Sequence, residues 1–284
     1  MTEHEAVRPG EYTSLPVVRR EAAALVLDGG AAGELLLPIV DGQAGAAAGE
    51  SLRVFIYQSA DGSPVPTLAR PLAAVGEVAW LAVADVSSVG AFLDWGLPRD
   101  VLVPFAEQQQ HLRAGQRVLC RIYLDRRGRI TGSTRLNRWL ADVAEGLSAG
   151  DPVSLMVAER TDLGYKMVVD HRFWGLLYHG DGLERLRPGT RLAGYVKQVR
   201  TDGRLDLTLA RPGGGRDRVN AVAEDILRQL DAAGGRLPYT DKSSPESIRD
   251  AFGVSKKVFK QALGSLYKRR LVALDDRGIG RIAS

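Results

Sequence analysis

The sequence predicts a multidomain protein with three small all-β barrels in tandem, followed by an α+β domain of helices and a hairpin. Two observations lead to this prediction. A pattern of short strands and glycines repeats along the first part of the 284 residues, and the hydrophobic period then changes from that of strands to that of helices. A chain of this length fits two to four compact units better than one small core.

The repeat is clearest in two stretches of equal spacing. Gly90 and Gly115 are 25 residues apart, and Gly164 and Gly189 have the same separation within a similar order of strands and turns. A weaker copy lies upstream, where the 13-residue glycine spacing of the second half recurs between Gly49 and Gly62. The chain therefore contains three related units.

Each unit has the strand pattern of a five-stranded barrel. Leu205, Leu207 and Leu209 alternate with polar residues, as in a half-buried strand. Strands recur every 8–15 residues, turns contain Asp-Gly or Arg-Gly, and each copy has about 65–70 residues, whereas a sandwich needs more strands. We expect a lead-in followed by three barrels, with the segments 1–11, 12–74, 75–145 and 146–211.

The upstream copy has fewer recognisable strands and few aromatic residues. Its strand candidates are Ala24–Leu27, Glu34–Val40 and Leu52–Tyr57, and the segment from Ser63 to Pro66 dilutes the pattern. We therefore expect this first barrel to be degenerate and mainly structural.

The C-terminal domain is expected over 216–284, after the glycine-rich break RPGGGRDR. A first helix has one apolar face and ends at Gly234-Gly235. Ser244 and Pro245 supply the N-cap and first position of a second helix, which ends at Gly253. Ser255 can cap a third helix that runs to about Arg270. A hairpin follows, with its turn at 275–278, and this order is that of a winged helix.

The third helix separates apolar from basic residues. At about 100° per residue, Phe259, Ala262, Leu263 and Leu266 share one side. The adjacent side is basic and continues into two arginines, which gives the candidate nucleic-acid-binding residues Lys256, Lys257, Lys260, Lys268, Arg269 and Arg270. From Gly213 onward there are 14 Lys/Arg against 9 Asp/Glu, so the tail carries +5 and the remainder −1 of the net +4. The tail is therefore the part that attracts phosphate most generally.

Specific motifs in the second copy resemble the repeat of ribosomal protein S1. They are Gly90–Asp94, Leu102-Val103, the strand led by Gly115, and Arg129–Ser133. The resemblance implies an oligonucleotide-binding (OB-fold) barrel that binds RNA on one face through aromatic and basic residues. Phe92 falls on the first aromatic position, and Pro104 stands where these repeats usually have His.

The segment DKSSPESIRDAFGVSKKVFKQALGSLYKRRLV, with GAFLDWGLPRDVLVPF and the GYKMVV…WGLLY block, resembles the bacterial conserved virulence factor B family. The resemblance covers about residues 75–284 well and the first barrel poorly. It implies three S1-type barrels followed by a winged helix that bind RNA and modulate gene expression after transcription.

Binding of a single strand needs side chains that stack on bases and neutralise phosphates. Each stacked base contributes roughly 1–3 kcal/mol, so two or three are needed in a barrel, and tethered barrels reinforce one another. We expect Trp174 to be packed rather than exposed. The candidates are Phe92, Trp95, Arg121, Tyr123 and Arg135 in the second barrel, and Lys166, Phe173, Tyr178, Tyr195 and Lys197 in the third.

The sequence contains no recognisable catalytic or metal-binding motif. The four His residues are scattered, and no Cys-x-x-Cys, His-Glu-x-x-His or phosphate-loop pattern is present. We therefore expect no enzymatic activity, cofactor, metal or small-molecule substrate. The sequence also lacks a signal-peptide core and an apolar run of about 18 residues, so we expect a cytoplasmic protein without a membrane partner.

These observations favour a bacterial RNA-binding protein that recognises single-stranded RNA and regulates gene expression after transcription. Two alternatives remain open. One is a winged-helix transcriptional regulator on duplex DNA, with the barrels as a sensor or dimer module. The other is a scaffold that docks onto the ribosome or an RNA-processing protein.

Overall fold

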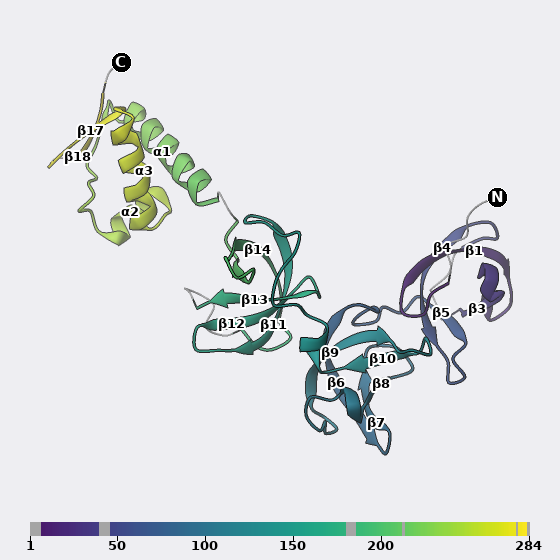
Figure 1. The fold of residues 1–284 in the computed structure, drawn as a ribbon. Coiled ribbons are helices and arrows are strands. Elements are labelled where there is room, and N and C mark those ends of the chain that lie inside the picture. The colour runs from purple at the N-terminus through teal and green to yellow at the C-terminus, as the bar shows by residue number, and fades with distance from the viewer. Residues whose placement is uncertain (1–6, 40–45, 180–185, 212–213, 277, 283–284) are drawn as a thin grey trace. The chain divides into compact units, whose positions relative to one another are not determined.

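The computed structural model describes residues 7–39, 46–179, 186–211, 214–276 and 278–282 (Figure 1). The chain forms two compact units. The first comprises residues 1–148 and 152–207 and holds three five-stranded sheets, whereas the second comprises residues 149–151 and 208–284 and holds the helices. The predicted fold class, all-β OB-like barrels followed by a winged helix, is confirmed.

The first sheet shows more strands than its sequence indicated. Its order is β3-β2-β1-β4-β5, and two strands were not predicted, β1 and β5. Leu15 and Val17 of β1 are buried between exposed or half-buried neighbours, so the alternation was present but Pro16 obscured it. Two prolines of β5 are tolerated because this strand lies at the end of the strand order. The strands are β1 (Tyr12–Arg20), β2 (Ala24–Asp28), β3 (Glu34–Pro38), β4 (Ser51–Gln58) and β5 (Pro64–Thr67).

The second and third sheets follow the same plan. The second has the order β10-β9-β6-β7-β8, and β8 lies next to β10. The third is a closed barrel, β11-β12-β13-β15-β14, in which β13 and β15 are parallel. The strands are β6 (Val78–Ser87), β7 (Gly90–Asp94), β8 (Val101–Pro104), β9 (Arg117–Leu124), β10 (Ile130–Ser133), β11 (Pro152–Arg160), β12 (Gly164–Val169), β13 (Phe173–Tyr178), β14 (Arg191–Val199) and β15 (Leu205–Thr208).

The three barrels are structural copies, as the glycine spacing predicts. The first strand of each contains a register shift directly after the valines Val17, Val83 and Val157. The carbonyls of these valines accept hydrogen bonds from the N–H groups of Gly49, Gly115 and Gly189, at 2.9, 2.8 and 2.8 Å. A bulge of this kind bends a strand and turns its side chains, which lets one short sheet curl into a barrel.

Apolar contacts join successive barrels of the first unit. Phe55 of the first barrel and Trp95 of the second meet edge to face, with ring centroids 5.7 Å apart, inside one buried cluster. A second cluster links Val78 of the second barrel to Met156 and Trp174 of the third. Both clusters remove large apolar side chains from water, which stabilises the contacts between barrels.

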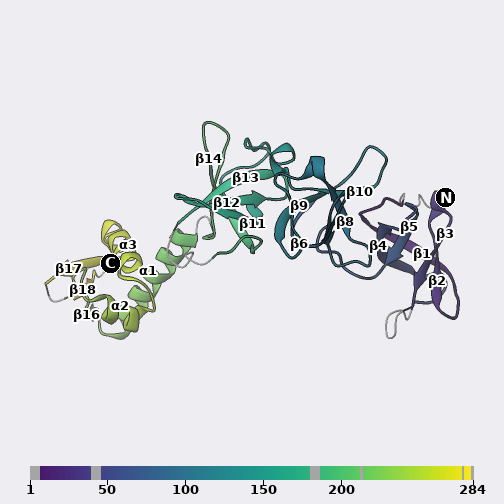
Figure 2. The ribbon, with the colours of Figure 1, turned by 90° about the horizontal axis from the view of Figure 1, so that it is seen from below.

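The second unit is a three-helix domain with a small sheet, and Figure 2 shows the hairpin β17–β18 beside α3. The sheet has the order β16-β18-β17, and β16 was not predicted. In the described ranges, no helix combines the length and apolarity that a membrane crossing requires. The elements are α1 (Gly214–Ala232), β16 (Arg236–Leu237), α2 (Pro245–Phe252), α3 (Lys256–Lys268), β17 (Val272–Asp275) and β18 (Gly278–Arg281).

The predicted helix caps are largely confirmed. The Ser244 hydroxyl accepts a hydrogen bond from the N–H of Ser247 at 3.1 Å, and Gly253 ends α2 with a φ of 65°. Ser255 occupies the N-cap of α3, but its side chain makes no capping bond. The helix ends at Lys268, two residues before the predicted Arg270. The predicted core face of α3 is buried, at Phe259, Ala262, Leu263 and Leu266.

Candidate nucleic-acid interface

Trp95 is a correction to the predicted interface of the second barrel. Its side chain is only 2% exposed, because the chain beyond β7 turns the ring into the core against Phe55. The indole Nε1 donates to the carbonyl of Arg99 at 2.6 Å, so its polar atom is also engaged. Trp95 therefore cannot stack on a base in this conformation.

The other predicted residues of the second barrel are half-buried. Tyr123 lies on β9 with its ring 4.6 Å from that of Trp139, a half-buried residue that sequence reasoning missed. The sequence feature that could have identified Trp139 as a binding candidate is an aromatic residue directly after a basic one, Arg138. Phe92 lies on β7, and the Arg135 Nε donates to the carbonyl of Gln108 at 3.2 Å.

Arg121 serves a contact between barrels. Its guanidinium donates to the carbonyl of His171 in the third barrel and lies 5.7 Å from the Trp139 ring centre. Burial lowers the pKa of Arg121, with nearby Glu77 acting in the opposite direction. The predicted RNA contact of Arg121 is therefore corrected to a structural one, because the guanidinium is half-buried and bonded within the protein.

Phe173 of the third barrel is a third correction, since it is 5% exposed. Trp174 is packed, as expected, and its Nε1 donates to the Asn137 side-chain oxygen at 3.0 Å. Lys166 is half-buried, with its Nζ 4.2 Å from the Trp174 ring centre and 3.7 Å from the Glu159 carboxylate. Lys166 therefore covers an indole ring that is itself largely hidden.

Tyr178 is the ring around which cations gather on the third barrel. It is half-buried, its hydroxyl accepts a hydrogen bond from the Arg200 guanidinium, and the Lys197 Nζ lies 5.7 Å from its ring centre. Arg200 was not predicted; it replaces the Asp that begins the same turn in the second barrel, Asp125. Tyr195, also half-buried, lies on β14 two residues before Lys197.

Arg200 is held by a buried carboxylate. Its Nε donates to the Oδ1 of Asp206 at 2.8 Å, and the Gln198 side chain donates to the other oxygen at 2.6 Å. Burial raises the pKa of Asp206, but these hydrogen bonds outweigh it and leave the pKa below its usual value. A hollow of about 340 Å³ lies beside this group, lined by Trp174, Leu176, Arg200 and Arg204 among others. Arg200 therefore links Tyr178, through its hydrogen bond, to the hollow that it lines together with Arg204.

The predicted basic residues of the winged helix are accessible. Lys257, Lys260, Lys268, Arg269 and Arg270 are exposed, and Lys256 is half-buried. Lys260 pairs with Asp241 across 3.6 Å, an exposed contact of little strength. Tyr267, which sequence reasoning missed, is 57% exposed next to Lys268.

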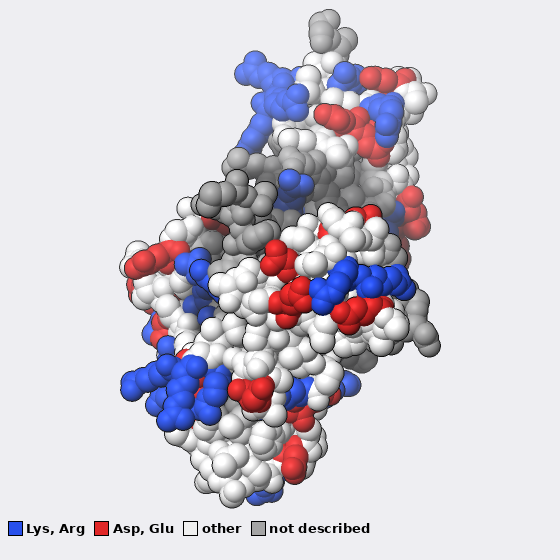
Figure 3. Space-filling model, turned by 90° about the vertical axis from the view of Figure 1, so that its right-hand side faces the viewer, with Lys and Arg blue, Asp and Glu red and all other residues white. Residues whose placement is uncertain are grey.

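On the one face that Figure 3 presents, neither sign of charge covers the whole surface. Figure 3 shows Lys/Arg and Asp/Glu side chains interspersed over the face it presents. A nucleic acid would therefore meet local groups of cations, as the near-neutral charge of the barrels indicates.

Two protein families match parts of the chain. The S1 domain matches residues 9–69, and the CvfB-like winged helix domain matches residues 224–280. The S1 match falls on the first barrel, which the sequence analysis regarded as the least typical copy. The S1 and winged helix domains indicate nucleic-acid binding.

Curated relatives match over most of their length. The Bacillus subtilis protein YitL is 30% identical over 238 residues, which cover 77% of this chain and 76% of YitL. Conserved virulence factor B of Staphylococcus epidermidis is 26% identical, covering 80% of this chain and 78% of the relative. A solved multidomain protein with nucleic acid binding domains from Streptococcus pneumoniae is 22% identical with a TM-score of 0.40, covering 96% of this chain and 98% of that one. The chain belongs to the conserved virulence factor B family.

Proposed function

We propose that this protein binds single-stranded RNA through its barrels and winged helix and regulates gene expression after transcription. It does so in the cytoplasm and without catalysing a reaction. The observation that supports this function best is Tyr178, a half-exposed ring with Lys197 and Arg200 beside it.

Rings of this kind favour unpaired nucleotides over a duplex. A duplex stacks its bases on one another, whereas a single strand offers their flat faces to Tyr178 and to the Tyr123–Trp139 pair. The cations next to Tyr178 neutralise the adjoining phosphates. Two stacked bases contribute roughly 2–6 kcal/mol, enough for useful affinity when the barrels are tethered.

The winged helix adds a phosphate contact. Among the described residues, Lys257 and Lys268 have no ion-pair partner, so their charges are available to a strand. Binding there is less selective for bases, because lysines contact phosphate rather than base edges.

The test measures binding of the full chain to a labelled single-stranded RNA and to duplex DNA of the same sequence, by fluorescence anisotropy at several salt concentrations. Binding to RNA should be tighter, with a salt slope of about −0.7 for each phosphate neutralised. The RNA should be recovered intact. Absent or salt-insensitive binding refutes the proposal, and tighter binding to the duplex would support a DNA-binding regulator instead.

Matched variants separate base stacking by the third barrel from phosphate binding by the winged helix. Tyr178→Leu should weaken RNA binding about tenfold through loss of the stacking ring, whereas Tyr178→Phe keeps the ring and should stay near the wild type. Lys257→Gln should reduce the magnitude of the salt slope by about 0.7, and Arg228→Gln on α1, where Arg228 already pairs with Asp225, should leave it unchanged.

A further inference from the structure

A cavity of about 610 Å³ opens between the first two barrels. Its walls are the β4–β5 turn of the first barrel, the β9–β10 turn of the second, and the segment that follows β7. Small-molecule sites commonly have volumes of about 300–1,000 Å³ and combine apolar walls with a few polar groups. This cavity has that size, and neither barrel encloses it alone.

Equivalent tyrosines line the cavity from both sides. The two turns are copies, since the N–H of Gly62 bonds to Ser59 in the first and that of Gly128 to Asp125 in the second. Tyr57 and Tyr123 each precede the turn glycine by five residues, and both are half-buried and line the cavity. The repeat therefore places two rings beside one space, one from each barrel.

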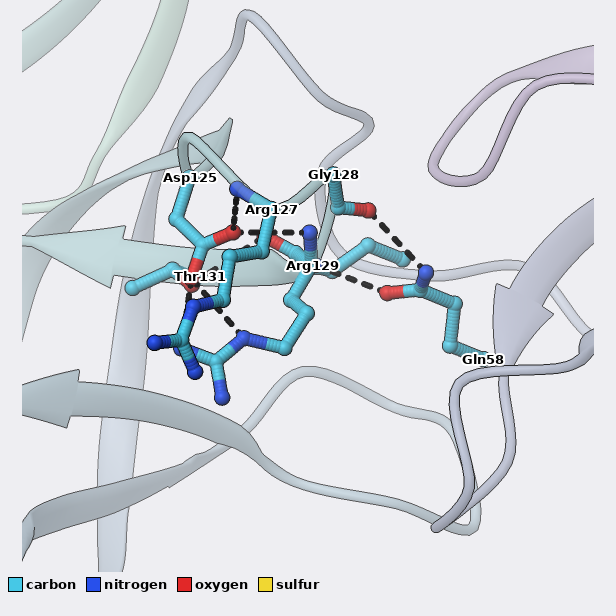
Figure 4. A network of polar contacts seen from close by, with 7 residues as sticks. Gln58, Asp125, Arg127, Gly128, Arg129 and Thr131 are labelled. Atoms are coloured by element: carbon cyan, nitrogen blue, oxygen red, sulfur yellow. Dashed lines mark hydrogen bonds and ion pairs between the residues drawn. The ribbon is translucent and has the colours of Figure 1, made fainter.

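Gln58 holds the two walls together (Figure 4). Its Nε2 donates to the carbonyl of Gly128 at 3.0 Å, and its Oε1 accepts from the N–H of Ile130 at 2.8 Å. The second barrel has Leu124 at the equivalent position, so this contact is particular to the first barrel. The Arg99 guanidinium adds a bond to the carbonyl of Ser59. A site held in this way needs little ordering when a ligand enters.

Three carboxylates line the cavity, those of Asp61, Asp100 and Asp125, and two of them already have hydrogen-bond partners. Asp125 accepts from the backbone N–H of Arg127 and of Arg129 with one oxygen and from the Arg129 guanidinium, at 2.7 Å, with the other. Hydrogen bonds from Ser59 and Ser63 lower the pKa of Asp61 to about 2.

One cation of the cavity is available. Within the described ranges, the exposed guanidinium of Arg127 has neither an ion-pair nor a hydrogen-bond partner. It is a suitable partner for an anion such as phosphate.

We propose that this cavity binds one nucleotide, with its base against Tyr57 and Tyr123 and its phosphate on Arg127. The first barrel thereby joins the binding surface through the wall it shares with its neighbour. The nucleotide can come from within a single strand, in which case this inference rests on the proposed function, or from a free nucleoside monophosphate.

The test uses the full chain and photocrosslinking to a single-stranded RNA that contains 4-thiouridine, with the linked peptides identified by mass spectrometry. The peptides with Tyr57 and Tyr123 should be linked. Competition with unlabelled UMP distinguishes the sources: links that a millimolar excess of UMP removes indicate a site for free nucleotides, and links that persist indicate a strand site. Either result supports the proposal that the cavity binds a nucleotide.

Matched variants test the two walls. Tyr57→Leu should reduce linking at Tyr123 about tenfold, because a stacking surface is lost. Tyr12→Leu is its control, since Tyr12 also packs on Phe55 but does not line the cavity. Arg127→Gln should likewise weaken linking about tenfold, and the adjacent exposed Arg126→Gln less than twofold, because Arg127 lines the cavity and Arg126 does not.

Three outcomes separate this inference from the proposed function. RNA that binds but links only outside the cavity overturns the inference and leaves the function standing. Equal losses for Arg126→Gln and Arg127→Gln also overturn it, because they would indicate general electrostatic attraction. If the full chain binds no RNA, the proposed function fails. Photocrosslinking to 4-thio-UMP then tests the cavity by itself: links at Tyr57 and Tyr123 support the proposed nucleotide site, and their absence overturns it.

Discussion

The contact of His171 with the second barrel predicts that acid loosens the junction of the second and third barrels. His171 lies in the β12–β13 turn, and its Nδ1 accepts a hydrogen bond from the N–H of Val78 at 3.0 Å. Burial lowers the pKa of His171. Of the charged groups that face it, Arg191 and Arg121 act in the same direction, and Glu77 and Asp170 oppose them.

The size of the effect follows from the atom that is left without a partner. A protonated imidazole carries a hydrogen on Nδ1 and cannot accept, so the N–H of Val78, a fully buried residue, loses its bond. An unsatisfied buried donor costs about 1–3 kcal/mol. The folded state takes up the proton less readily than the unfolded state. The stabilisation is therefore complete above the ordinary pKa of 6.5 and is lost as the pH falls through the lower folded value.

Hydrogen exchange at the Val78 amide measures this directly. After correction for the intrinsic rate, protection should fall about tenfold or more between pH 7.5 and 5. His171→Asn tolerates the left-handed backbone found there, with a φ of 57°, and should show low protection at both pH values. His111→Asn is the control, because His111 is exposed in the second barrel. Equal pH profiles for the wild type and His171→Asn would refute the reasoning.

Three further predictions concern residues whose roles the tertiary structure defines. Trp95→Ala should lower the free energy of unfolding by about 3–5 kcal/mol in urea denaturation, because the ring is 2% exposed, and a stability equal to that of the wild type would contradict a core role. Asp206→Asn should lower the free energy of unfolding by about 1–3 kcal/mol at neutral pH, because Arg200 loses its charge partner. The wild type should lose stability as the pH falls below 3.8, since the pKa of Asp206 is lowered in the folded state, and the variant should not. Identical acid denaturation of both proteins would exclude this role. Gly90→Ala should lower the melting temperature of the first unit, since its Cβ would lie 2.3 Å from the carbonyl oxygen of Val103, and an unchanged calorimetric transition would show that the strands adapt.

Much of the fold was predictable because its signals are local. The glycine spacing marks equivalent turns, and the cap at Ser244 and the apolar face of α3 depend on residues within a few positions of one another. The strand β1 escaped detection because Pro16 interrupts an otherwise regular alternation, and β5 because its prolines are unusual in strands.

The sequence by itself determined the number of barrels, the winged helix and the basic character of α3, because each follows from a period or a cap that neighbouring residues create. Only the tertiary structure decided which rings can meet a ligand. Phe173 and Trp174 are consecutive in a strand and point to opposite faces, yet both are buried, because Trp174 packs in a cluster with the second barrel. Whether a ring is exposed depends on which distant segment of the chain packs over it, and the spacing of residues within one strand does not predict that segment.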